Sequence, residues 1–137
     1  MITEDYVSFE VAKLLKEKGF PQEYDVYHSM VYNEEDYEDE YEVQRMVLQT
    51  CLIKAGTLSS YPIGVPEPKC YCPTLQMAMK WLREVHSLFI CVEIGVGAYV
   101  WTITNTIDYV VVYVDATIGT YERAVEAAIK YCLENLI

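Results

Sequence analysis

The first 20 residues place apolar side chains three or four positions apart, the spacing of one helix face. The apolar positions are Val7, Val11, Leu14 and Leu15, with Phe9 and Ala12 widening the face. Thr3 is suited to cap the first turn, because its hydroxyl accepts a backbone hydrogen bond. Gly19 follows Lys16 and Lys18 and supplies a left-handed stop. The pattern predicts a helix over residues 4–18.

Residues 23–32 are rich in aromatic and β-branched side chains and alternate between two faces, which predicts a strand. Residues 42–54 fit both a helix and a strand, because Val43, Val47 and Cys51 recur at a spacing that suits either. We favour a strand here. The acidic residues between the two strands would then form the connection of a β-hairpin.

Two further helices are predicted from capping residues followed by apolar stripes. Thr74 is the expected cap of a helix that ends near residue 87, and Thr120 is the expected cap of a C-terminal helix. The first stripe contains Leu75, Ala78, Met79, Leu82, Val85 and His86, with Trp81 beside it. The second contains Tyr121, Ala124, Val125, Ala128, Cys132 and Leu136.

Residues 88–104 and 108–116 are β-rich, with a turn candidate at 105–108 and a possible break of the first strand at Gly95 or Gly97. The predicted order is therefore α-β-β-α-β-β-α. Helices and paired strands in this order favour one α+β domain spanning residues 1–137, with an antiparallel sheet of about four strands and three helices packed on it. A length of 137 residues suits a single domain.

Charge is concentrated in the N-terminal third. The chain carries a net charge of −11, and residues 1–42 hold thirteen of its twenty-one acids but three of its ten basic residues. Binding along nucleic-acid phosphates or anionic membranes relies on clustered Lys and Arg, and no basic stripe is visible. The N-terminus lacks a secretory signal pattern, and no apolar run is long enough to span a membrane. We expect a soluble, cytoplasmic protein.

The densest acidic stretch, residues 34–42, holds seven carboxylates and two tyrosines. It has no glycine and lacks the alternating ligand positions of an EF-hand loop, so we do not predict a calcium site. Either it is a solvated hairpin tip or it is a patch that attracts an Arg- and Lys-rich protein surface. The candidate partner-binding residues are Glu34, Glu35, Asp36, Tyr37, Glu38, Asp39, Glu40, Tyr41 and Glu42.

No catalytic, metal-binding or cofactor-binding motif is apparent, so we predict no enzymatic activity, no metal and no cofactor. Zinc sites usually need two ligand pairs, and the chain offers only Cys70 and Cys72 with His86 further on. An odd count of five cysteines favours reduced thiols that fill the core. His86, on the apolar side of its helix, is expected to be a hydrogen-bonded structural histidine.

Two further functions remain open. A small-ligand sponge for nucleotides or metabolites would use a pocket under the proline-rich loop of residues 54–69. The aromatic residues proposed to line that pocket are Tyr61, Tyr71, Trp81, Tyr99 and Trp101. A structural homo-oligomer would instead pair an apolar β-edge, for which residues 109–114 are suited.

Three blocks of the sequence read MITEDYVSFEVAKLLKEKGF, CPTLQMAMKWLREVH and TYERAVEAAIKYCLENLI. They resemble a family of short, uncharacterised proteins of phages, prophages and mobile elements of gut bacteria. In that family, similar helices bracket a middle part that differs between members. The resemblance implies an accessory protein acting in the cytoplasm of a bacterial host. Together with the charge pattern it favours a non-enzymatic module that binds a host protein, such as one with a basic nucleic-acid-binding surface.

Overall fold

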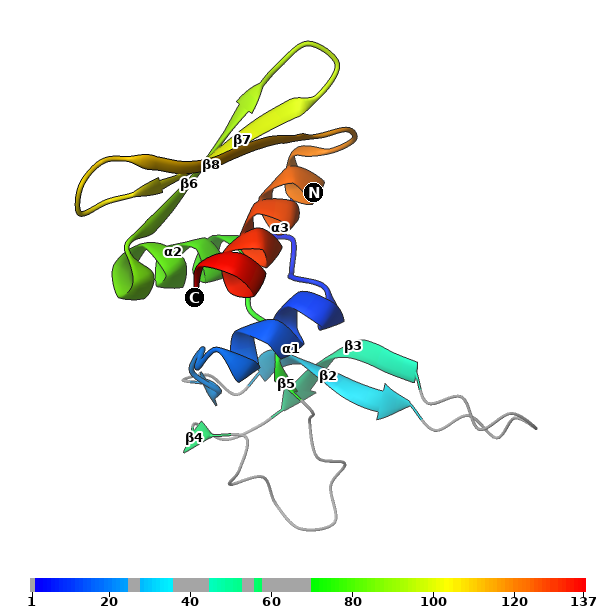
Figure 1. The fold of residues 1–137 in the computed structure, drawn as a ribbon. Helices are drawn as coiled ribbons and strands as arrows, with labels where there is room; N and C mark the ends of the chain where they lie inside the picture. The colour runs from blue at the N-terminus through cyan, green and yellow to red at the C-terminus, as the bar shows by residue number, and fades with distance from the viewer. Residues whose placement is uncertain (1, 25–27, 36–44, 53–55, 58–69) are drawn as a thin grey trace.

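The computed structural model describes residues 2–24, 28–35, 45–52, 56–57 and 70–137 (Figure 1). Side chains are described for residues 2–22 and 70–137. The elements are, in chain order, α1 (Phe9–Glu17), β1 (Glu23–Tyr24), β2 (His28–Glu35), β3 (Arg45–Leu52), β4 (Gly56–Thr57), β5 (Cys70–Tyr71), α2 (Leu75–His86), β6 (Leu88–Ile94), β7 (Tyr99–Asn105), β8 (Val111–Thr117), α3 (Tyr121–Tyr131) and the π-turn η2 (Cys132–Leu136).

The strands in the described part of the chain form three antiparallel sheets, which confirms the α+β class but differs from the single sheet of about four strands that we predicted. Their orders are β1-β4, β3-β2-β5 and β6-β7-β8. The β6-β7-β8 sheet has α2 and α3 on one side (Figure 1). Short β5 joins the β2-β3 hairpin through the pairs Val31–Tyr71 and Tyr32–Cys70. After β5 the chain enters α2, and the next strand along the chain, β6, belongs to a different sheet.

Helix α1 begins at Phe9, so the predicted start at residue 4 and the predicted Thr3 cap are wrong. Ser8 is the cap, and its hydroxyl accepts a hydrogen bond from the Val11 N–H at 3.3 Å. The preceding residues are extended because they pair with the entry to α2: Val7 N–H donates to the Pro73 carbonyl at 3.2 Å. The predicted left-handed stop at the C-terminal end of this helix is confirmed, since Gly19 has a φ of +94°.

Helices α2 and α3 are capped by Thr74 and Thr120, as predicted, and each hydroxyl accepts from the N–H three residues on. In α2, the predicted stripe is too wide, because Val85 is 60% exposed. In α3, the predicted stripe is too narrow, because Ile129 and Leu133 are completely buried as well. Both continue the four-residue spacing of Val125, which is the spacing of one helix face, and the π-turn η2 forms the end of this helix.

Residues 88–104 are divided at the break considered at Gly95 or Gly97 into two strands, so three strands separate α2 from α3. Gly95 N–H donates to the Ala98 carbonyl at 2.8 Å and closes the turn between β6 and β7. A side chain at Gly95 would place its Cβ 2.8 Å from Val100 Cγ2, and Gly97 has a φ of +74°. The chain therefore reverses where two glycines permit a tight turn.

The strand assignment for residues 42–54 is confirmed by β3. Strands β2 and β3 are paired residue by residue from His28–Leu52 to Glu35–Arg45. The predicted first strand spanned residues 23–32, whereas its first residues form β1, which pairs with β4, and β2 runs from His28 through Glu35. The hairpin ladder therefore includes the first two acids of the 34–42 stretch, which we had placed in the connection.

One hydrophobic cluster joins the three helices to β5 and to the β6-β7-β8 sheet. It contains the inner faces of α1, α2 and α3, together with Leu88 of β6, Trp101 and Ile103 of β7, and Cys70 and Cys72 around β5. The small residues Ala78, Ala124 and Ala128 are completely buried, which allows the helices to approach closely. None of the described helices is both long enough and apolar enough to cross a membrane.

Candidate functional site

The acidic candidate site begins at the end of the β2-β3 ladder. Glu34 is paired with Met46, and Glu35 is paired with Arg45. The ladder extends away from the layer formed by α2 and α3 (Figure 1). The other candidate partner-binding residues lie outside the described part of the chain; these are Asp36, Tyr37, Glu38, Asp39, Glu40, Tyr41 and Glu42. The described backbone thus leads into the acidic stretch along two paired strands.

The aromatic residues proposed to line a ligand pocket fall into separate groups. Tyr61 lies outside the described residues. Tyr71 and Trp81 meet at Phe20, with ring centroids 6.2 Å and 5.4 Å from that of Phe20. Trp81 also contacts His86 edge to face at 4.6 Å. These rings fill the space between β5, α2 and the end of α1.

Trp101 and Tyr99 belong to the other group, on the helix side of β7. Trp101 is 3% exposed, and its indole N–H donates to Thr117 Oγ1 at 2.9 Å. It also packs against Tyr113 and Tyr131, whose rings stack at 3.7 Å. Tyr99 contacts Tyr121 at the start of α3. Trp101 is therefore a core residue with a satisfied N–H, which is the usual role of a buried tryptophan.

His86 packs against Trp81, as expected of a structural histidine, but its Nε2 atom differs from the expectation. That atom is buried and has no hydrogen-bond partner among the described residues. An unsatisfied buried nitrogen costs about 1–3 kcal/mol of stability. No described nucleophile or carboxylate is hydrogen-bonded to it, so the described contacts do not form a catalytic pair.

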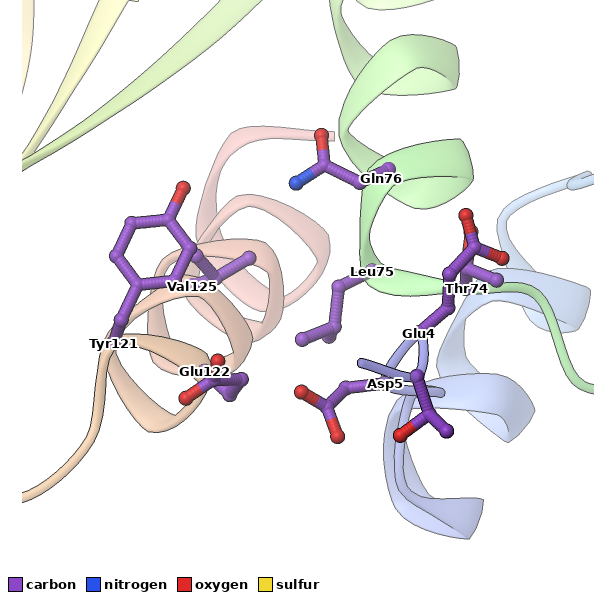
Figure 2. A pocket seen from close by; sticks show the side chains of 9 residues that line it. Glu4, Asp5, Thr74, Leu75, Gln76, Tyr121, Glu122 and Val125 are labelled. Carbon is purple, nitrogen blue, oxygen red and sulfur yellow. The ribbon is translucent and has the colours of Figure 1, made fainter. Parts of the chain in front are cut away.

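A cavity that sequence reasoning missed lies where α2 and α3 begin (Figure 2). Its volume is about 220 Å³, which is below the ~300–1,000 Å³ of typical small-molecule sites. Three segments line it: residues 3–5, the first turn of α2 and the first turn of α3. The lining residues are Thr3, Glu4, Asp5, Thr74, Leu75, Gln76, Tyr121, Glu122 and Val125. The capping threonines were the only sequence signal for this place.

The charges around this cavity compensate one another. Two helix N-termini favour an anion, but Glu4, Asp5 and Glu122 supply negative charge at the same place. Acceptors of the chain itself also bind N–H groups in the first turn of α2. Leu75 N–H donates to the Asp5 carbonyl at 3.0 Å, and Met77 N–H donates to the Thr74 hydroxyl at 3.2 Å. We interpret the cavity as a helix-capping arrangement.

The buried cysteines are poor nucleophiles. Burial raises the pKa of the Cys70 thiol from 9.0 to about 11 and that of the Cys132 thiol from 9.0 to about 12. Cys72 is also buried, and its thiol donates to the Val7 carbonyl at 3.3 Å. Because the thiolate is the reactive form, these groups stay unreactive near neutral pH. The described cysteines Cys70, Cys72, Cys91 and Cys132 are free thiols, as predicted.

The Cys132 thiol should make folding less favourable at alkaline pH. The folded-state pKa of this thiol lies above its ordinary value of 9.0. The stability that the protonated, buried thiol contributes is therefore complete below pH 9 and is lost as the pH rises toward about 12. The free energy of unfolding should fall by up to about 1.4 kcal/mol per pH unit in this window. Urea unfolding of the wild type and Cys132→Ala at a series of pH values measures the effect. The two stabilities should converge above pH 9. Parallel lines for Cys132→Ala would contradict the expected effect.

Within the described ranges, no three His, Cys, Asp or Glu side chains gather closely enough to hold a metal ion. Comparison of the chain with protein-family models, with curated proteins and with solved structures finds no match. The resemblance to phage and prophage proteins accordingly stays a prediction.

Proposed function

We propose that the protein is a non-enzymatic interaction module that binds a host protein through its acidic hairpin. The observation that carries the proposal is the β2-β3 ladder, which remains in register to Glu35–Arg45. It leads the chain into a run of carboxylates and leads it out again nine residues later. The ladder holds the two ends of this run side by side at Glu35 and Arg45, and a segment tied at both ends has less chain entropy to lose on binding than a free tail.

The charge distribution defines the chemistry of the partner. Seven carboxylates in residues 34–42 favour a surface rich in Arg and Lys, such as the nucleic-acid-binding face of a host protein. Carboxylates accept bidentate hydrogen bonds from Arg, while Tyr37 and Tyr41 add contact area and hydroxyl groups. Association should be fast and should weaken as salt is added, because exposed charges are screened within about 8 Å at physiological ionic strength.

The described chemistry supports a binding role more than a catalytic one. The thiols of Cys70 and Cys132 are protonated near neutral pH, and the His86 ring packs against Trp81. The cavity at the two helix N-termini is small and its charges are compensated. In keeping with the resemblance of its terminal blocks, we propose that the protein acts in the cytoplasm of a bacterial host.

Reversal of three acids within the hairpin tests the proposal. The triple variant Asp36→Lys, Glu38→Lys and Glu40→Lys should reduce capture of the bound protein from a bacterial lysate at least about tenfold, since each change replaces an attraction by a repulsion. Capture by the wild type should also decrease as salt is raised. The measurement is quantitative mass spectrometry of the retained proteins.

A matched triple variant separates a local site from a general charge effect. Glu17, Glu84 and Glu93 are exposed and lie on α1, α2 and β6. Changing these three to Lys alters the net charge equally and should leave capture unchanged. Equal capture by the wild type and the hairpin variant would overturn the proposal, as would equal loss in both variants.

A further inference from the structure

Strand β3 is the outer strand of the β3-β2-β5 sheet (Figure 1). It pairs with β2 on one side, and no described strand pairs with it on the other. Among the described elements, only β2 has extensive contact with β3. Residues of an antiparallel strand direct their N–H and C=O groups alternately toward one side and toward the other. Within the described part of the chain, every second residue of β3 therefore lacks a strand partner for its backbone groups.

The outer edge of β3 is long and regular. All 8 residues, Arg45–Leu52, pair with β2 in one unbroken register. The sequence RMVLQTCL contains no proline, glycine or lysine, and Arg45 is its only charged residue. Proline, lysine and bulges are the devices that commonly keep other strands away from an edge. The backbone of β3 is therefore suited to accept an added strand along its length.

The edge that the sequence suggested for a homo-oligomer, residues 109–114, is less regular. Tyr109 has a φ of +61°, which is not a strand conformation, and the register of β7 with β8 shifts between Ile103 and Thr104. No run of charge adjoins this edge in the sequence. The chemistry of a partner is therefore defined better at β3 than at β8.

The charge at the end of the ladder indicates what occupies the β3 edge. Residues 34–42 hold seven carboxylates, and Glu35 lies opposite Arg45, the first residue of β3. A partner held by these carboxylates carries Arg and Lys, and it lies next to the start of the edge. The net charge of −11 disfavours a second copy at the same place, because the acids of two copies would repel each other. The charge pattern thus favours a basic segment of another protein.

We propose that the partner of the acidic hairpin adds an extended segment bearing Arg and Lys to the outer edge of β3; because it concerns the same partner, this inference rests on the proposed function. Main-chain hydrogen bonds of the added strand supply affinity, and its basic side chains pair with the carboxylates at the end of the ladder. The β3-β2-β5 sheet gains a fourth strand. The site selects a basic segment that is extended and rejects a helix of the same charge.

Two peptides of equal charge separate strand addition from charge attraction. The first has 8 residues, the length of β3, and alternates arginine with valine. The second has the same side chains, but all its backbone amides are N-methylated, so it cannot donate the hydrogen bonds of a ladder. In isothermal titration calorimetry, the first should bind at least about tenfold more tightly than the second. Equal affinities, or binding of neither peptide, would overturn strand addition.

Proline substitutions test the edge itself. Of two neighbouring residues in β3, one directs its N–H toward β2 and the other toward the outer edge. One of Leu48→Pro and Gln49→Pro should therefore break the ladder, while the other removes only an edge donor, which edge strands tolerate. The variant that keeps the wild-type melting temperature should bind the arginine–valine peptide at least about tenfold more weakly. Unchanged affinity in that variant contradicts the proposal.

Amide hydrogen exchange of the wild type provides a test that does not depend on how a variant folds. The arginine–valine peptide should slow exchange at alternate residues of β3 and leave β6 and β8, the edges of the other three-stranded sheet, unchanged. Protection at β6 or β8 instead of β3, or no protection, overturns the proposed pairing. Lysate capture by the triple hairpin variant tests the acidic site separately. Capture that is lost in that variant, together with equal affinity for the two peptides, would overturn strand addition alone.

Discussion

Trp101→Ala should lower the free energy of unfolding by about 3–5 kcal/mol, the usual cost of truncating a buried tryptophan. The side chain is 3% exposed and lies between the stacked pair of Tyr113 and Tyr131 and the rest of the core. Its removal leaves a cavity beneath β7 and leaves the Thr117 hydroxyl without its donor. Chemical denaturation followed by far-UV circular dichroism measures the change.

Two comparisons separate the contributions to this effect. Trp101→Phe keeps an aromatic ring and removes the hydrogen bond to Thr117, so it should cost less than Trp101→Ala; the bond itself accounts for about 1 kcal/mol. Tyr109→Ala removes an aromatic ring that is 83% exposed and should change stability by less than about 0.5 kcal/mol. A loss below about 1 kcal/mol for Trp101→Ala would show that the space beneath β7 is not close-packed.

Leu15→Ala should cost about 2–5 kcal/mol and should destabilise the distant sheet as much as its own helix. Leu15 is completely buried in α1, and it belongs to the same hydrophobic cluster as Trp101 of β7. If residues 1–137 form one cooperative domain, unfolding of α1 and of β7 must be a single transition. The fluorescence of Trp101, measured in a Trp81→Phe background, should therefore shift to the same lower midpoint as the circular dichroism signal.

The control for this experiment is Lys13→Ala, which changes an exposed residue of the same helix and should move neither midpoint by much. A circular dichroism transition that shifts while the Trp101 transition stays in place would show two folding units. In that case the prediction of a single domain would be wrong, although the α+β class would be unaffected.

The sequence predicted the parts of the fold that depend on neighbouring residues. A threonine followed by an apolar stripe predicted the starts of α2 and α3, because a cap acts on donors two or three residues away. Gly19 predicted the end of α1 for a similar reason. The alternation around residues 42–54 favoured the strand that β3 confirms.

The candidate sites also contain features that the sequence shows directly and features that depend on tertiary contacts. The acidic stretch was visible as a run of charge, whereas β2 differs from the predicted strand at both ends, since it begins at His28 and reaches Glu35. The sequence shows which residues are aromatic. Their separation along the chain could not show that Trp81 contacts Phe20 while Trp101 contacts Tyr131. The cavity at the two helix N-termini combines three separate segments, so no local pattern predicted it.

What the sequence by itself determined is therefore the set of elements held by short-range interactions: the caps, the stops, the alternating strands and the uneven charge. Tertiary contacts decided between alternative local structures whose free energies were close. Residues 5–7 satisfy their backbone by pairing with residues 73–75 instead of extending α1. The described strands separate into three sheets, and Leu133 joins the same hydrophobic cluster as residues of α1 and β7. In each case the deciding contact lies far away in sequence, because burial and hydrogen bonding are settled by neighbours in space.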